Sequence, residues 1–187
     1  MANKDSAFGL RPIGKVGQNR DNQGLSEYDI AASASALYQN DPVEMAATGT
    51  ITVAAATDTL LGSLTGVFFT DASTSKPTFA NHLKGSNTAT DIKGFVADDP
   101  YERFEIQSDD ATAAADVGLN ADIVYAAGAS QNYVSKVELD HSDLKTATAQ
   151  LRVLAISKDI ENNEAGSANV NLVVMINEHF LKGTTGI

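Results

Sequence analysis

Three acidic residues within positions 94–108 have the types and spacing most suited to chemistry: Asp98, Asp99 and Glu102. Together they could bind a hard cation or act as an acid/base pair. Their spacing lacks the alternate oxygen ligands and the distal glutamate of a calcium-binding loop, and adjacent carboxylates beside a proline are common in turns. The favoured interpretation is therefore a turn, and a hydrolase or metal enzyme is the least favoured function.

The three histidines, His82, His141 and His179, are the candidate general bases of the chain. The run His141-Ser142-Asp143 has the residue types of a hydrolytic triad, but consecutive residues of a strand point to opposite faces and do not form one. Neither His82 nor His179 has a convincing partner at zinc-site spacing. Because the chain has no cysteine, thiolate nucleophiles and Cys-based zinc sites are excluded. We expect a protein that is not an enzyme and has no cofactor or metal.

The charge balance limits the partners of the protein. The 187 residues include 24 acidic and 13 basic side chains, for a net charge of -11, and neutralising nucleic-acid phosphates requires an excess of Lys and Arg. Residues 1–20 lack the apolar core of a signal peptide, and no segment approaches the roughly twenty apolar residues of a membrane span. We therefore expect no nucleic-acid partner, no membrane partner and a product that stays where it is made or leaves by lysis.

The elements that must position these residues are predicted to be strands. In residues 101–108, Phe104 and Ile106 alternate with polar residues, and Pro100 before them marks a bend or sheet edge. Further extended segments are predicted at residues 25–30, 43–46, 50–54, 67–69, 94–97, 122–126, 134–140, 150–156 and 170–180. About nine or ten short strands without helical periodicity predict an all-β protein, an antiparallel β-sandwich or barrel of jelly-roll or tulip-like type.

Two segments depart from this pattern. Residues 1–24 are polar and glycine-rich, so we predict an extended N-terminal arm, with residues 25–187 forming a single β-rich domain. The residues Phe8, Leu10, Arg11 and Pro12 form a compact anchor that would dock on a neighbouring subunit; plain disorder is the alternative. Residues 70–93 read as a long surface excursion held by Phe79 and Leu83.

The last predicted strand has two apolar faces. Its inward face carries Val170, Leu172, Val174 and Ile176. On the other face Val173 and Met175 are flanked by Asn171 and Asn177. A strand with apolar residues on both faces is either buried on both sides or faces a partner. Val173 and Met175 are therefore the predicted oligomer interface, and we expect a homo-oligomer, most simply a homotrimer.

Four segments, in this order, resemble a known family across nearly the whole chain. They are MANKDSAFGLRP at positions 1–12, GVFFT at 66–70, GFVADDP running into FEIQ at 94–107, and GLN at 118–120. The chain is similar to the small virion proteins of marine and freshwater, cyanophage-like tailed phages that are described as capsid decoration or cement proteins. The resemblance implies a β-rich structural protein, often a trimer, that is made in the host cytoplasm and lies on the capsid exterior, with the major capsid protein as its partner. The predicted anchor, Phe8, Leu10, Arg11 and Pro12, would then contact the capsid.

Two other functions remain open at this point. One is a virion-borne β-sandwich module that binds glycans or a host surface, although the absence of Trp and the presence of only five Tyr weaken that interpretation. The other is a structural component of the head-tail region.

Overall fold

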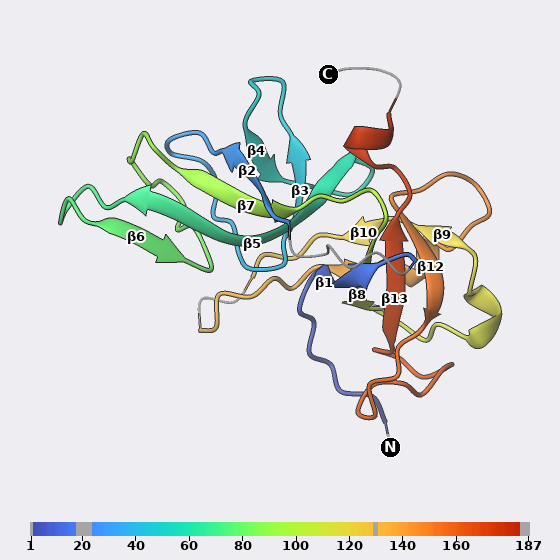
Figure 1. The fold of residues 1–187 in the computed structure, drawn as a ribbon. Coiled ribbons are helices and arrows are strands. Elements are labelled where there is room, and N and C mark those ends of the chain that lie inside the picture. Colours follow the sequence, from blue (N-terminus) through green and yellow to red (C-terminus); the bar gives the residue numbers. More distant parts are fainter. Residues whose placement is uncertain (1, 18–23, 129–130, 184–187) are drawn as a thin grey trace.

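The computed structural model describes residues 2–17, 24–128 and 131–183. The predicted all-β, antiparallel class is confirmed, with the sheets packed in a sandwich-like arrangement (Figure 1). The strands are β1 (Arg11–Lys15), β2 (Ser26–Asp29), β3 (Pro42–Met45), β4 (Ile51–Val53), β5 (Leu60–Thr70), β6 (Pro77–Ala80), β7 (Lys93–Ala97), β8 (Glu102–Gln107), β9 (Asn120–Ala121), β10 (Ile123–Val124), β11 (Glu138–Leu139), β12 (Leu151–Ile156) and β13 (Asn171–Ile176). Single turns of 3-10 helix follow at η1 (Ala114–Asp116), η2 (His141–Asp143) and η3 (Phe180–Lys182).

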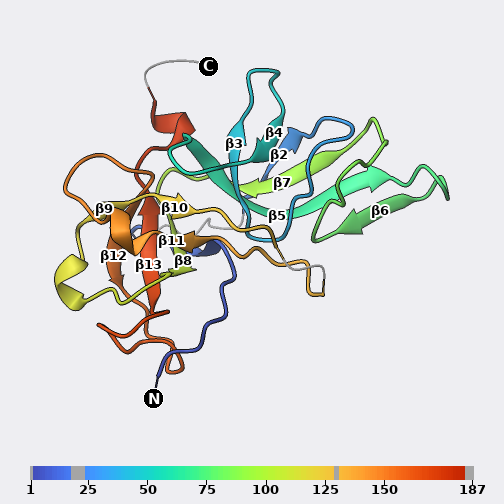
Figure 2. The same ribbon diagram turned by 180° about the vertical axis from the view of Figure 1, so that it is seen from behind.

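The strands form two large sheets and a short ribbon. The five-stranded sheet has the order β1-β8-β13-β12-β9, and the six-stranded sheet has the order β2-β7-β5-β3-β4 with β6 paired to β5. Strands β10 and β11 form the ribbon, which Figure 2 shows beside the five-stranded sheet. In Figure 1 the β5–β6 hairpin extends away from the rest of the molecule.

The stretch 94–107 joins the two large sheets, because β7 belongs to one and β8 to the other. The predicted bend lies between them. The Asp99 carbonyl accepts a hydrogen bond from the Glu102 amide at 2.9 Å, and the Asp99 carboxylate accepts one from the Tyr101 amide at 2.8 Å. After this turn Phe104 and Ile106 are fully buried, as their alternation predicts.

Each large sheet has its own hydrophobic core, and β5 contributes to both. The core of the five-stranded sheet includes Phe104, the inward residues of β13, and Val137 and Leu139 from the ribbon side. The core of the six-stranded sheet includes Leu61, Leu64 and Val67 of β5, whereas Leu60 packs in the other cluster. A long strand that passes from one core to the other ties the two sheets into one packed unit.

The N-terminal segment requires a correction to the predicted arm. Leu10 is fully buried in the core, and β1 pairs with β8 as the edge of the five-stranded sheet. The Lys4 amide donates to Asn162 Oδ1 at 3.1 Å, and Asn162 Nδ2 donates back to the Lys4 carbonyl at 2.8 Å. Gln107 Oε1 accepts from the Ser6 amide at 2.8 Å. A segment with few apolar residues is thus ordered by the amide side chains of Gln107 in β8 and of Asn162 in the loop between β12 and β13. Positions 18–23 lie outside the described residues.

The excursion at residues 70–93 also differs from expectation. It contains β6, which pairs with β5, and Leu83 is fully buried as predicted. Phe79, however, is 74% exposed and does not hold the segment to the core. Strand β5 begins at Leu60, seven residues before the predicted start at Val67. The prediction missed the first part of the strand because Gly62 and Ser63 interrupt the apolar pattern in the sequence.

Candidate interaction surfaces

An apolar groove lies on the outer face of the five-stranded sheet, and its floor contains the predicted residues Val173 and Met175. Val173 pairs with Glu105 of β8, and Met175 pairs with Arg103. Both apolar side chains are half-buried and line a cavity of about 740 Å³. The other face of β13 is fully buried, so the structure places the strand with one face in the core and one face in this groove.

Two irregularities in strand pairing widen the apolar area of the groove. The pairing of β1 with β8 shifts between Pro12 and Gly14, and the pairing of β12 with β13 shifts between Val153 and Ala155. A bulge places two residues opposite one and redirects a side chain. The residues at the shifts, Ile13 and Leu154, both line the groove, and Ile13 is 45% exposed.

The charged groups of the groove that have no ion-pair partner among the described residues are positive, although the protein is strongly acidic. Arg103 and Lys158 line it, and neither forms an ion pair with any residue that the structure describes. The one carboxylate of the lining, Glu105, is buried, ion-paired to Arg11 and hydrogen-bonded to the Ser157 hydroxyl. The groove therefore offers apolar contact flanked by two unpaired cations.

A second exposed apolar surface, here the phenylalanine patch, lies on the six-stranded sheet and consists of Phe68, Phe79 and Phe95. Phe68 pairs directly with Phe79 across β5 and β6, and their ring centroids are 4.8 Å apart. Phe95 pairs with Gly66, which has no side chain to separate the rings. The Phe79 and Phe95 rings are accordingly 6.1 Å apart and inclined by only 19°.

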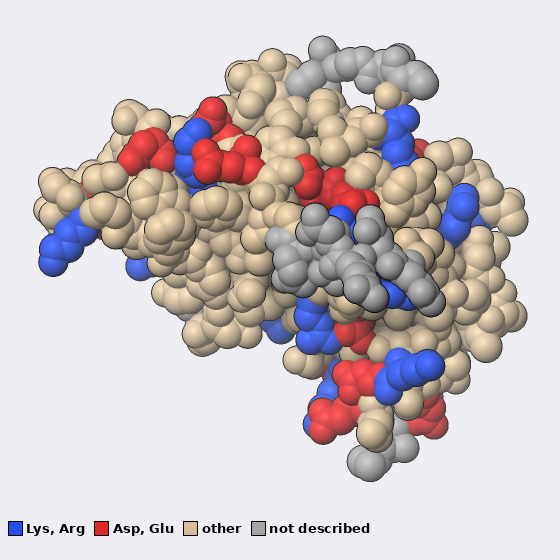
Figure 3. All heavy atoms as spheres, viewed as in Figure 1, with Lys and Arg blue, Asp and Glu red and all other residues tan. Residues whose placement is uncertain are grey.

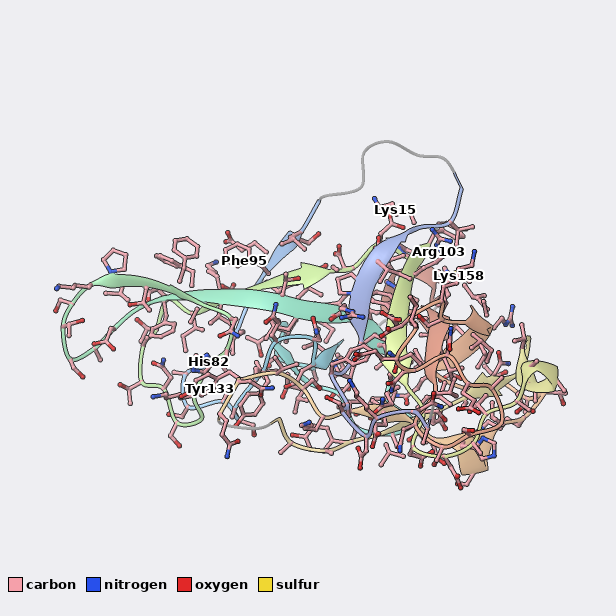
Figure 4. The ribbon with its side chains drawn as sticks, turned by 90° about the horizontal axis from the view of Figure 1, so that it is seen from below. Lys15, His82, Phe95, Arg103, Tyr133 and Lys158 are labelled. Carbon is pink, nitrogen blue, oxygen red and sulfur yellow. The ribbon has the colours of Figure 1, made fainter. Side chains whose placement is uncertain are left out.

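Charged side chains border the phenylalanine patch on the β2 side. Lys93 lies between Glu27 at 3.4 Å and Asp29 at 2.7 Å, and Figure 3 shows this group of acidic and basic atoms beside a largely uncharged surface. Figure 4 shows Phe95 on the upper side of its sheet and Arg103 and Lys158 at the upper right. The two apolar surfaces therefore open toward the same side of the molecule.

The four predicted contact residues of the N-terminal segment lie together around the start of β1. The Arg11 guanidinium lies 4.5 Å from the centre of the Phe8 ring, and Pro12 is half-buried opposite Phe104. Leu10 is fully buried in the protein's own core, so its prediction as a contact with another subunit is corrected. Phe8, Arg11 and Pro12 stay predicted contacts.

The three acids of the turn each have a separate partner. Asp98 accepts a hydrogen bond from the Tyr28 hydroxyl at 2.6 Å, and Lys15 pairs with Asp99 at 2.7 Å, which lowers the pKa of that carboxyl. Glu102 accepts from a backbone amide of β1 at 2.9 Å, while burial raises its pKa. These contacts fix the turn and hold β1 in place.

The three histidines lie apart from one another, and His141 is the one with a hydroxyl partner among the described residues: its Nδ1 lies 3.3 Å from the Thr112 hydroxyl, which contacts the Ser108 hydroxyl at 2.8 Å. The His82 ring stacks on Tyr133 with centroids 3.6 Å apart and planes inclined by 5°, on the side opposite Phe95 in Figure 4. His179 is buried, and burial lowers its pKa to about 4. Across residues 2–17, 24–128 and 131–183, no cluster of three or more His, Cys, Asp or Glu side chains is placed to hold a metal ion.

Comparison with known proteins adds no assignment: no family model, curated protein or solved structure matches the chain. Within the described part of the chain, no helix is long and apolar enough to cross a membrane. The sequence predicted the outward orientation of Val173 and Met175, whose role as an oligomer interface stays a prediction, but it did not predict the phenylalanine patch. The signal was present in Phe68 and Phe95, but Phe79 lay in a segment predicted to have no strand.

Proposed function

We propose that this chain is a structural virion protein that binds the outside of a phage capsid and stabilises contacts between major capsid subunits. The sequence resemblance supports this role, and the observation that carries it is the phenylalanine patch. Phe79 is 74% exposed and Phe68 and Phe95 flank it. Contiguous apolar surface of this kind marks interaction sites in soluble proteins, and aromatic side chains dominate binding energy at protein interfaces.

The position of the patch suits contact with a large, flat partner. It lies on the sheet that carries the projecting β5–β6 hairpin (Figure 1), and the charged group of Glu27, Asp29 and Lys93 forms a polar rim on one side. Aromatic anchors surrounded by polar side chains are the usual organisation of an interface. Burial of each ring contributes about 1.5–3 kcal/mol to binding.

The test is occupancy on purified shells that lack this protein. Phe79→Ser should lower the affinity for shells about tenfold or more, since a loss of about 1.4 kcal/mol corresponds to tenfold. The matched control is Val117→Ser, which replaces another exposed apolar residue, 41% exposed, away from the patch. Equal occupancy of wild type, Phe79→Ser and the control would show that the phenylalanine patch is not part of the capsid contact. Absence of any binding by the wild type would reject the proposed function itself.

Glycan binding is the second candidate function, and the same rings favour it. Exposed aromatic rings are platforms on which sugars stack, and Phe79 and Phe95 are nearly parallel. A glycan array separates the two roles. A glycan-binding module binds glycans on the array in the absence of shells, and the Phe79→Ser variant loses this binding.

A structural role in the head-tail region is distinguished from a role on the shell exterior by electron microscopy of labelled particles.

A further inference from the structure

A loop next to the groove carries the most exposed large apolar side chain among the described residues. Ile160 is 85% exposed and lies between Asp159 and Glu161. The loop follows β12 directly, after Ser157 and Lys158 at the edge of the groove. An apolar tip flanked by two carboxylates is therefore presented close to an apolar floor flanked by two cations.

Hydrogen bonds hold this loop in a defined shape. The Asp159 carboxylate accepts from the Glu161 amide at 3.1 Å and from Asn171 Nδ2 at 3.3 Å, and the Asp159 carbonyl accepts from the Asn162 amide at 3.1 Å. These bonds close a turn whose tip is Ile160. The side chain is thus presented outward by an ordered turn, so little conformational entropy is lost when a partner covers it.

The loop and the groove are complementary in both polarity and charge. Val173 and Met175 give the groove an apolar floor, which matches the apolar side chain of Ile160. Lys158 and Arg103 have no ion pair among the described residues. The Glu161 carboxylate forms an ion pair with Lys4, and both side chains are about two-thirds solvent-accessible. An exposed ion pair contributes little to stability. Glu161 can therefore leave Lys4 and pair with Arg103 or Lys158 of another copy with little loss of free energy.

We infer that the groove of one copy binds the Ile160 loop of a second copy. This inference concerns self-association and goes beyond the proposed capsid contact, which uses the phenylalanine patch. Loop and groove are different surfaces of one chain, so the contact is head-to-tail, and such contacts produce closed rings when the rotation closes. Because the loop and the groove lie close together on each copy, the contact between neighbouring copies would lie near the rotation axis of a small ring. The trimer predicted from the sequence is such a ring.

The first test is sedimentation of purified protein. Wild type should associate at micromolar concentration, and Ile160→Asp and Val173→Asp should each weaken association at least about tenfold, as expected for the loss of about 1.4 kcal/mol or more. Val117→Asp places the same charge at another exposed apolar residue and should associate like wild type. Circular dichroism controls for folding. A monomeric wild type, or an oligomer unaffected by both Ile160→Asp and Val173→Asp, would overturn the inference.

The second test uses a mixture of the two variants. The Val173→Asp chain retains an intact loop and the Ile160→Asp chain an intact groove, so each associates more weakly alone, whereas one intact contact can form between them. An equimolar mixture should therefore contain dimers, and their dissociation constant should rise with salt because Glu161 and the cations lie at the contact. A mixture that stays monomeric would contradict a head-to-tail contact. Neither test involves shells, so its result is independent of capsid binding.

Discussion

Asp41 predicts a pH dependence of stability that one substitution isolates. This carboxylate is fully buried where the N-terminal segment meets β3 and β5. Its Oδ2 accepts the Tyr38 amide at 2.7 Å, and its backbone carbonyl accepts the Leu64 amide at 2.9 Å. Burial outweighs the hydrogen bonding of the carboxylate and raises the pKa of Asp41 from its ordinary value of 3.8 to about 6.

The size and sign of the effect follow from this difference in pKa. A rise of about two pK units corresponds to about 3 kcal/mol, because each unit is worth 1.36 kcal/mol. Between about pH 4 and 6 the folded protein binds a proton that the unfolded chain has released. The stability associated with protonated Asp41 is therefore present below about pH 4 and lost as the pH rises through 6. Asp41→Asn cannot ionise, so its free energy of unfolding should increase relative to wild type across this range.

His179 acts in the opposite direction. Burial lowers its pKa from 6.5 to about 4, so the unfolded chain binds more protons between these values and stability increases as the pH rises. The two buried groups partly cancel in the wild type. The informative quantity is therefore the difference between variant and wild type, from which the contribution of His179 drops out.

The assay is urea unfolding of Asp41→Asn and wild type at steps from pH 4 to 7.5 and at one fixed protein concentration. The difference in unfolding free energy should grow by about 3 kcal/mol in favour of the variant. Asp5→Asn, at an exposed carboxylate, corrects for the change in net charge. A difference that stays constant with pH would refute the reasoning, because Asp41 would then titrate alike in the folded and unfolded states.

Three further predictions concern the N-terminal segment. Leu10→Ala should lower the unfolding free energy by about 2–5 kcal/mol. Ile13→Ala, at a 45% exposed position, should change it by less than about 0.5 kcal/mol. Equal effects of the two substitutions in urea unfolding would contradict the burial of Leu10. Gly9→Ala should lower the free energy of unfolding by more than about 1–2 kcal/mol, because φ of Gly9 is +74° and the added Cβ would lie 2.4 Å from the Asn40 carbonyl oxygen. A melting temperature equal to that of the wild type would contradict this expectation. Asn162→Ala should accelerate trypsin cleavage after Lys4, whose backbone it binds, while the protein stays folded; an unchanged cleavage rate would mean that other contacts hold the segment.

The sequence by itself determined the fold class and the inward faces of the central strands. Phe104 and Ile106, and the inward residues of β13, repeat every second position and are fully buried. Successive side chains of a strand point to opposite faces, so this spacing is a local property that needs no knowledge of the partner strand. For the same reason Val173 and Met175 could be assigned to the outer face before the groove was known.

Tertiary structure alone decided how the N-terminal segment and the two apolar surfaces are built. The burial of Leu10 depends on β8 and on amide groups of Gln107 and Asn162, about a hundred or more residues away along the chain. The outward turn of Ile13 depends on a shift in pairing with β8, and the phenylalanine patch depends on the register of three strands. Each of these features is set by contacts between distant segments, and periodicity within one segment carries no information about the register of its partner.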